Sequence, residues 1–264
     1  MSRRVLITGA ASGIGAATAA KLRSRGALVA GLDVSPGDDS DLIACDVRDQ
    51  RSVDRAVTEA VQRLGGLDVL INNAGIGEGQ SAGRAPDERA VAILDVNLIG
   101  PWRVTAAALP ALREARGRVV NVASGLAHLA IPLVPAYAMS KRGLAAYSDA
   151  LRLEHGDAIT VTTVYPGYIK TPIHRASEED GFALDGIVPE EKLDRVAKVM
   201  ARAALGRPVR DLATSRRGGF QYLLLRGLPR RLMDRLVLAV LRREARRGRF
   251  DRSALARELV ARLS

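Results

Sequence analysis

Two side chains suited to proton transfer, Tyr137 and Lys141, stand four residues apart in a segment with helical spacing. Side chains at positions i and i+4 share one face of a helix, so the phenol and the ammonium group are expected to lie close together. A free phenol has a pKa of about 10, which makes it a poor base near neutral pH, but a nearby cation favours the phenolate. The pair therefore indicates an acid–base group that could act on an alcohol or ketone oxygen.

Two other polar residues could complete this site. Ser124 follows a predicted strand at 117–122, where its hydroxyl could donate a hydrogen bond to a substrate oxygen. Asn97 lies within a predicted helix, although asparagine is a mediocre helix former. Taken singly, Tyr137 could be an interfacial aromatic, Ser124 a turn residue and Asn97 a solvated polar group. Their occurrence together with Lys141 favours a catalytic set.

Predicted strands and helices alternate along the first two thirds of the chain. Apolar runs predict strands at 4–8, 27–32, 42–45, 67–71, 117–122 and 159–164, and helical spacing predicts helices at 16–25, 50–64, 87–112 and 136–155. Pro101 is expected to interrupt the third helix. Continuous apolar strands that alternate with helices are typical of an α/β fold with a doubly wound parallel sheet, which binds ligands outside the carboxyl ends of its strands.

A glycine-rich turn follows the first of these strands. The segment Thr8-Gly9-Ala10-Ala11-Ser12-Gly13-Ile14-Gly15 joins that strand to the first helix. Glycines allow a tight turn there and let backbone N–H groups approach a pyrophosphate at the helix N-terminus. An ordinary turn between a strand and a helix could have the same composition, so the turn alone is weak support for a dinucleotide site.

The spacing of this turn, G-x-x-x-G-x-G after a threonine, resembles the glycine motif of the short-chain dehydrogenase/reductase family. The resemblance continues in order over residues 5–172, about two thirds of the chain. It includes the N-N-A-G segment at 72–75, Asn97, Ser124 placed 13 residues before Tyr137, the Y-x-x-x-K motif at 137–141 and the P-G-x-x-x-T segment at 166–171. It implies a single-domain Rossmann fold and hydride transfer between a nicotinamide cofactor and an alcohol or ketone.

The resemblance also implies roles for individual residues. Tyr137 would be the general acid or base, Ser124 would polarise the substrate oxygen, and Lys141 would hold the nicotinamide ribose. Asn97 would hold a water molecule that links Lys141 to solvent. The implied cofactor contacts are Gly9, Ser12, Gly13, Ile14, Gly15, Asp33, Asp46, Val47, Asn73, Ala74, Gly75, Tyr137, Lys141, Pro166, Gly167, Ile169 and Thr171.

Asp33 bears on which cofactor is bound. It ends the second predicted strand, 18 residues after Gly15, and no Arg or Lys follows it directly. A carboxylate at this place accepts hydrogen bonds from the adenosine ribose hydroxyls and repels a 2′-phosphate, so NAD is expected rather than NADP. Asp33 could also be a loop-capping residue. Asp46, which the resemblance pairs with the adenine amine, could likewise be a turn residue.

The net charge of +11 is confined to the end of the chain. Residues 1–206 carry equal numbers of basic and acidic side chains, whereas residues 207–264 hold 16 Arg and five Asp or Glu. We therefore expect a catalytic domain at 1–206 and an Arg-rich helical extension at 207–264. A basic amphipathic helix is predicted after Pro229. Its apolar stripe could pack on protein, the interpretation we favour, or residues 227–249 could contact an anionic membrane surface.

The predicted substrate site is apolar. A lid is expected at about 172–194, and the segment 126–134 is also largely apolar. Both would suit a hydrophobic secondary alcohol or its ketone. The lid residues that could face substrate are Ile173, Phe182, Leu184 and Ile187. No metal is predicted, because the three histidines do not form a metal-binding pattern: His128, His155 and His174.

Composition bears on the cellular location of the protein and on its alternative functions. A single cysteine, Cys45, excludes an intramolecular disulfide, and no apolar run approaches the ~20 residues of a membrane span, so we expect a cytoplasmic protein. The resemblance implies a homodimer or homotetramer. The neutral body argues against nucleic-acid binding by the main domain. Two alternatives stay open: an NAD-sensing module without catalysis, and a membrane- or nucleic-acid-associating protein on the same scaffold.

Overall fold

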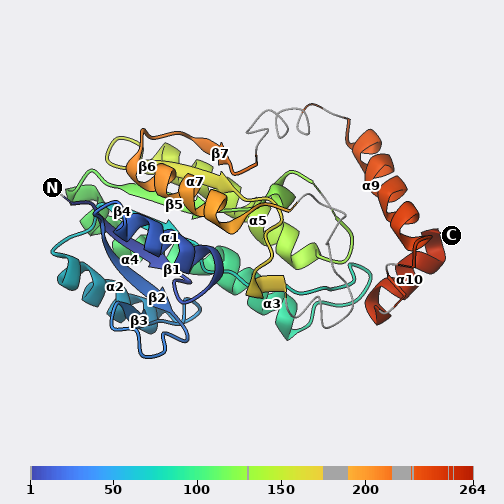
Figure 1. Cartoon of the computed structure of the whole chain (residues 1–264), viewed down its shortest axis with the longest axis horizontal. Helices are drawn as coiled ribbons and strands as arrows, with labels where there is room; N and C mark the ends of the chain where they lie inside the picture. Colours follow the sequence, from blue (N-terminus) through green and yellow to red (C-terminus); the bar gives the residue numbers. More distant parts are fainter. Residues whose placement is uncertain are drawn as a thin grey trace.

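A computed structural model describes residues 2–129, 131–174, 190–215, 227, 229–248, 250–251 and 253–263. Its centre is a sheet of seven parallel strands in the order β3-β2-β1-β4-β5-β6-β7, with helices on both faces (Figure 1). The predicted doubly wound sheet is confirmed. The strands are β1 (Arg4–Thr8), β2 (Leu28–Asp33), β3 (Leu42–Ala44), β4 (Val69–Asn72), β5 (Arg118–Val122), β6 (Thr160–Tyr165) and β7 (Asp211–Ala213).

Alternation along β1 explains the two helical layers. Val5, Leu6 and Ile7 are fully buried, and successive side chains of a strand point to opposite faces. Val5 and Ile7 pack in one core cluster with residues of α1 and α7, whereas Leu6 packs in a second cluster with residues of α2, α4 and α5. The flanking helices are α1 (Gly13–Arg23), α2 (Gln50–Leu64), α3 (Glu88–Leu94), α4 (Gly100–Glu114), α5 (Pro135–His155) and α7 (Leu193–Leu205).

The predicted helix at 87–112 is divided by a wider turn. After α3 the backbone forms a π-helical turn, Asp95–Ile99, and α4 begins directly afterwards. Pro101 follows this π-helical turn closely, and the break in the α-helical pattern before it agrees with the expectation that Pro101 interrupts the helix, since proline has no N–H to donate to the preceding turn. The irregularity is the π-helical turn before it, which contains Asn97. Such turns are frequent at functional sites.

One strand of the sheet was not expected from the sequence pattern. β7 has three residues and pairs with Thr163, Val164 and Tyr165 of β6. A run this short shows no alternation from which a strand could be predicted. It lies beyond residue 206, where we expected the catalytic domain to end. The sheet therefore continues for one strand into the predicted extension.

The chain ends in two helices at the opposite end of the molecule from the N-terminus (Figure 1). They are α9 (Arg230–Ala245) and α10 (Ala254–Leu263). Leu241 of α9 and Ala256 of α10 are buried in one cluster with residues of the segment 126–134. The predicted helix after Pro229 is thus present, and part of its apolar surface packs on protein.

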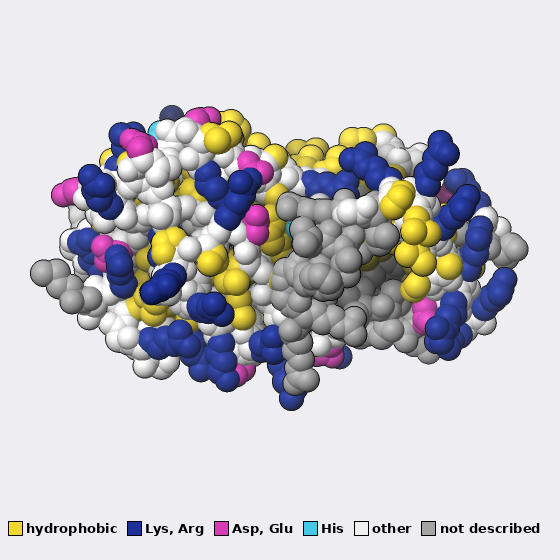
Figure 2. Space-filling view, turned by 90° about the horizontal axis from the view of Figure 1, so that it is seen from above, with side chains coloured by type: hydrophobic (Ala, Val, Ile, Leu, Met, Phe, Trp, Pro, Cys, Tyr) yellow, Lys and Arg dark blue, Asp and Glu magenta, His cyan; other side chains and the backbone are white. Residues whose placement is uncertain are grey.

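The outer face of α9 is different. Leu232, Leu236 and Val240 follow one another at intervals of four residues and are 42%, 49% and 44% exposed. Figure 2 shows apolar side chains flanked by Lys and Arg side chains at the end of the molecule where α9 and α10 lie. No helix in the described part of the chain is long and apolar enough to cross a membrane.

Candidate functional site

The glycine-rich turn lies at the carboxyl end of β1, between that strand and α1. Gly9 and Gly13 have φ of +67° and +53°, which favours glycine over any residue with a side chain. A Cβ on Gly15 would lie 1.9 Å from the carbonyl oxygen of Gly9, so no side chain fits there. Ser12 is the N-cap of α1, and Ile14 lies in its first turn. This cradle of bare backbone at a helix N-terminus fits a pyrophosphate.

The segment after β4 is fixed to the glycine-rich turn. The Nδ2 atom of Asn73 donates to the carbonyl oxygens of Thr8 and Gly9, at 3.0 and 3.2 Å. The Thr8 hydroxyl oxygen accepts from the backbone N–H groups of Asn73 and Ala74, both at 3.0 Å. A Cβ on Gly9 would lie 2.8 Å from the Cα of Ala74. These contacts hold the two predicted cofactor segments against each other.

Asp33 is the last residue of β2 and Asp46 follows β3, on the same edge of the sheet. The Asp33 carboxylate accepts from the backbone N–H of Ala11 at 2.9 Å and from that of Ser35 at 3.0 Å. It is therefore held beside the glycine-rich turn. Asp46 instead forms an ion pair with Arg48 at 2.7 Å, and hydrogen bonds from the Arg48 side chain lower its pKa. In this arrangement the carboxylate of Asp46 is engaged by a neighbouring cation.

Tyr137, Ser124 and Lys141 meet at the carboxyl end of β5. Tyr137 lies in the first turn of α5, and a hydrogen bond joins its hydroxyl to that of Ser124. The Nζ atom of Lys141 lies 5.6 Å from the centre of the Tyr137 ring. It donates to the carbonyl oxygen of Val122, the last residue of β5, at 3.0 Å. The structure thus brings together three of the four predicted catalytic side chains.

Burial dominates the acid–base properties of this group. Desolvation raises the pKa of Tyr137, and the hydrogen bond to Ser124 offsets part of that rise. Lys141 is 3% exposed, and burial lowers the pKa of its ammonium group to about 8. We expected the cation to lower the pKa of the phenol; the pKa is instead raised, because desolvation is the largest effect on it. A neutral phenol is the state that donates a proton.

Asn97, the fourth predicted residue, is fully buried in the π-helical turn rather than solvated. Its Oδ1 atom accepts from the backbone N–H of Ile76 at 2.8 Å, and its Nδ2 atom donates to the Ile76 carbonyl at 2.9 Å. Nδ2 also lies 3.2 Å from the hydroxyl of Ser140, which donates to the Tyr137 carbonyl. A Cβ on Gly75 would lie 3.3 Å from Oδ1 of Asn97, so a glycine permits this approach.

The segment after β6 completes the edge of the sheet. The Pro166 carbonyl accepts from the backbone N–H of Gly125 at 2.8 Å, which links this segment to the residue after Ser124. A Cβ on Gly13 would lie 3.6 Å from the Thr171 side chain, so the segment approaches the glycine-rich turn. Ile169 is buried in the core. Pro166, Gly167, Ile169 and Thr171 therefore belong to a segment that lies on the same edge of the sheet as the glycine-rich turn and Ser124.

Other predicted residues lie at the margin of this site or outside the described residues. Val47 is buried beside Gly100, and Ile173 lies within 3.7 Å of where a Cβ on Gly77 would be. The lid residues Phe182, Leu184 and Ile187 lie outside the described residues. Among the residues that the structure describes, no group of three or more His, Cys, Asp or Glu side chains could hold a metal ion.

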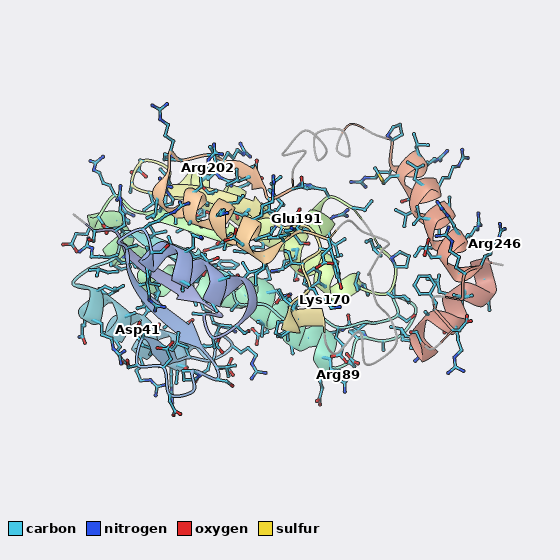
Figure 3. All side chains as sticks on the ribbon, in the orientation of Figure 1. Asp41, Arg89, Lys170, Glu191, Arg202 and Arg246 are labelled. Carbon is cyan, nitrogen blue, oxygen red and sulfur yellow. The ribbon has the colours of Figure 1, made fainter. Side chains whose placement is uncertain are left out.

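Sequence reasoning missed Glu191, which supports the segment after β6 (Figure 3). Its carboxylate accepts from the hydroxyl of Thr214, which is fully buried, and the oxygen of that hydroxyl accepts from the backbone N–H of Gly167 at 3.4 Å. A Cβ on Gly167 would lie 2.5 Å from Oε1 of Glu191. Burial raises the pKa of this carboxyl group, while the Thr214 hydrogen bond lowers it. No local sequence pattern indicates this contact, because Thr214 comes 23 residues after Glu191 in the chain.

We expect Glu191→Ala to lower the free energy of unfolding by about 1–3 kcal/mol, because the buried Thr214 hydroxyl loses its acceptor. Glu191→Gln keeps an acceptor and removes a charge whose burial is unfavourable, so it should cost less. Urea unfolding at pH 7 measures both. The neighbouring, exposed Glu190 supplies the control Glu190→Ala. Equal losses in the variants at 190 and 191 would contradict the assigned contacts.

Comparison with known proteins agrees with this geometry. The short chain dehydrogenase family model matches residues 3–181. 3-Oxoacyl-(acyl-carrier-protein) reductase MabA of Mycobacterium avium is 34% identical over 205 residues, which cover 75% of this chain and 80% of that protein. 3-Ketodihydrosphingosine reductase of Bacteroides thetaiotaomicron is 37% identical over 172 residues, which cover 63% of this chain and 64% of that protein.

The fold agrees as well. The crystal structure of 3-ketoacyl-(acyl-carrier-protein) reductase from Brucella melitensis, complexed with NADH, superposes with a TM-score of 0.71 at 27% identity. The superposition covers 81% of this chain and 98% of that one. The motifs, the seven-stranded parallel sheet and the length of the family match all lead to one assignment: the chain belongs to the short chain dehydrogenase family of NAD(P)-dependent oxidoreductases.

Proposed function

We propose that this protein transfers a hydride between NAD(H) and an alcohol or ketone carbon, with Tyr137 as the general acid or base. The observation that carries the proposal is the junction of Tyr137, Ser124 and Lys141 at the carboxyl end of β5. This junction lies on the same edge of the sheet as the cradle formed by Gly9, Gly13 and Gly15. The bound nicotinamide would supply or accept the hydride, and the protein would position the reacting groups.

The side chains around Tyr137 have distinct tasks in ketone reduction. The Ser124 hydroxyl donates to the ketone oxygen and polarises it, which stabilises the negative charge that develops there. The Tyr137 phenol gives its proton to the same oxygen, and the raised pKa keeps that proton available at neutral pH. Lys141 stabilises the phenolate that remains, and by resemblance to the family it also holds the nicotinamide ribose. Asn97 fixes the backbone of Ile76 and, through Ser140, the turn that carries Tyr137.

The decisive experiment is turnover of a panel of ketones and secondary alcohols with NADH or NAD. Activity on neither class, with either nicotinamide cofactor, would contradict the proposal. The alternative of an NAD-sensing module predicts cofactor binding without turnover, so a binding measurement on the same sample separates the two. We favour catalysis because Tyr137, Ser124 and Lys141 are all present and lie together at the carboxyl end of β5.

Asp33 supports a preference for NAD over NADP. Its carboxylate is held beside Ala11 of the glycine-rich turn, where the adenosine ribose is expected. We expect wild-type kcat/KM to favour NADH over NADPH by at least about tenfold, because a 2′-phosphate would meet this negative charge. Asp33→Ser should narrow the ratio, mainly by raising the KM for NADH. The exposed Asp39 supplies the control Asp39→Ser, and an unchanged ratio in the Asp33 variant would contradict the assignment.

A hydrophobic ketone or secondary alcohol is the proposed substrate class. The segment 126–134 beside Ser124 contributes apolar side chains to the cluster that Leu241 and Ala256 join. The relatives from Mycobacterium avium and Bacteroides thetaiotaomicron are named as reductases of 3-oxoacyl and 3-ketodihydrosphingosine compounds, which supports a ketone attached to an aliphatic chain. A panel in which sugars or short carboxylic acids were the best substrates would contradict this class.

We also propose a homodimer or homotetramer formed through α4 and α5. Three large apolar side chains on these helices are exposed: Trp102 at 57%, Met139 at 56% and Leu153 at 89%. Large exposed apolar side chains on these helices support a protein–protein contact there. Light scattering should give a mass of at least twice the 28.1 kDa of one chain. Membrane contact through 227–249 stays a prediction, which liposome flotation tests.

A further inference from the structure

A buried and unsatisfied carboxamide lies close to the catalytic helix. Gln80 belongs to the loop between β4 and α3, and its backbone N–H donates to the carbonyl of Leu133 at 2.8 Å. Leu133 precedes Tyr137 by four residues. Both the Oε1 and the Nε2 atom of Gln80 are buried, and neither has a hydrogen-bond partner within the described part of the chain. A buried polar group without a hydrogen bond lowers the stability of the fold, so its presence here requires a physical explanation.

The loop that carries Gln80 runs between the catalytic tyrosine and α10. A Cβ on Gly77 would lie 3.3 Å from the Tyr137 ring, and a Cβ on Gly79 would lie 2.9 Å from the Leu255 side chain. Tyr137 and Leu255 thus approach positions of this loop that are two residues apart, and both pack against one apolar cluster. Gln80 follows at once, so its Cα lies within about 10 Å of that of Gly77.

An apolar wall surrounds this place, and the C-terminal helices build much of it. We call it the tail wall; its buried members are Leu133, Val134, Leu241, Phe250 and Ala256, and Tyr137 packs against it. Arg84 and Glu258, 3.7 Å apart, link the loop to α10 at the exposed rim. The tail wall is thus in contact with the catalytic residue itself.

The backbone at Leu133 shows that this arrangement is enforced by its surroundings. Leu133 has φ of +67°, a conformation that a leucine rarely adopts and that persists only where packing and hydrogen bonds impose it. Its side chain is buried in the tail wall, and its carbonyl accepts from Gln80. The strained residue therefore ties Gln80 to the wall at the start of α5.

We propose that Gln80 binds a polar group of the substrate while the tail wall packs against the substrate's apolar chain. A carboxamide both donates and accepts, so a group that does both, such as a hydroxyl or a secondary amide, satisfies it best. The substrate class is then an aliphatic ketone or secondary alcohol that also carries a hydroxyl or amide group. This inference rests on the proposed hydride transfer.

Gln80→Leu tests the polar contact. The probes are 2-nonanone and 2-nonanones that carry one hydroxyl at carbon 4, 6 or 8, each reduced with NADH. In wild type, kcat/KM for at least one hydroxyketone should exceed kcat/KM for 2-nonanone by roughly tenfold or more. Gln80→Leu should bring the ratio of these two values, the hydroxyketone ratio, close to one. Its melting temperature should match or exceed that of wild type, because the substitution removes an unsatisfied buried amide.

A structural role for Gln80 gives a different result. The melting temperature would fall, turnover of all probes would fall together and the hydroxyketone ratio would be kept; this would overturn the proposal. Gln62→Leu on the exposed side of α2 is the matched control and should leave the ratio unchanged. If wild type reduces none of the ketones, the proposed function itself fails, whereas reduction without any hydroxyketone preference overturns only the inference.

Substitutions that make the side chain of Leu255 smaller or larger test the tail wall, against which Leu255 packs. With 2-butanone, 2-octanone and 2-dodecanone as probes, Leu255→Ala should shift the preferred chain length upward and Leu255→Trp should shift it downward. The same substitutions at Leu236, on the outer face of α9, are the controls and should leave the preference unchanged. If each Leu255 variant changed the turnover of all three ketones by the same factor, Leu255 would act only in packing. That result would overturn the assignment of the tail wall to the substrate site.

Discussion

Replacing Tyr137 with phenylalanine is expected to lower kcat for ketone reduction by roughly 10²- to 10⁴-fold, the usual range for removal of a general acid. Among the residues that the structure describes, the polar neighbours of the phenol are the Ser124 hydroxyl and an ammonium group that donates to the Val122 carbonyl, and neither replaces it as an acid. The ring itself remains, so packing against Gly77 and the tail wall is kept. Steady-state kinetics with the best ketone from the panel measure the loss.

Two controls separate chemistry from damage to the fold. NADH binding, followed by fluorescence titration, should change little in Tyr137→Phe. Tyr147 lies ten residues further along α5 and stacks on Trp102 with ring centres 5.4 Å apart; burial raises its pKa to about 12. Tyr147→Phe should therefore keep most of the activity. If Tyr137→Phe retained more than about a tenth of wild-type kcat, the assignment of the general acid would be wrong.

Lys141→Met should combine a large loss of activity with no loss of stability. The variant lacks the cation beside the phenol, and we expect kcat/KM to fall by about 10²-fold or more. Lys141 is buried and desolvation lowers its pKa, so its charged form opposes folding at neutral pH. The lowering from 10.5 to about 8 corresponds to about 3 kcal/mol, part of which is offset in the variant by the lost hydrogen bond to Val122.

The contribution of Lys141 to the free energy of unfolding should depend on pH. Between about pH 8 and pH 10.5 the unfolded chain binds a proton on Lys141 that the folded chain has released, so the free energy of unfolding of wild type should rise with pH across that window. Lys141→Met should lack this rise. Ketone reduction by wild type should decline above about pH 8 as the cation is lost. Urea unfolding and kcat/KM at a series of pH values check both; parallel stability curves for the two proteins would contradict the assigned pKa.

Local patterns were sufficient to predict most of the sheet and the candidate site. The strands from β1 to β6 are apolar runs that end in recognisable turns, and the site motifs all follow strand ends, so the topology of a parallel sheet brings them to one edge. α2 was predicted with its bounds correct, because Asp49 caps its start and Gly65, with φ of +68°, ends it. Tyr137 and Lys141 meet because helical spacing alone places them on one face.

Long-range contacts limited the prediction. The π-helical turn around Asn97 depends on tertiary hydrogen bonds to Ile76 and Ser140, which no local pattern specifies. Glu191 and Thr214 come together only after the sheet has formed. The raised pKa of Tyr137 depends on how deeply the site is buried, whereas the sequence shows only that a cation is near. Gln80 has an ordinary loop sequence, and its importance is visible only from its buried, unsatisfied atoms.

The short strand β7 sets a practical boundary for shortened versions of the protein. A chain cut at residue 206 would leave the backbone of β6 without the partner that Thr163, Val164 and Tyr165 have in the intact sheet. Thr214, directly after β7, would be lost with it, and so would the hydroxyl that donates to Glu191. An exposed strand edge invites pairing with other chains. A shortened form of the protein should therefore extend at least through residue 215.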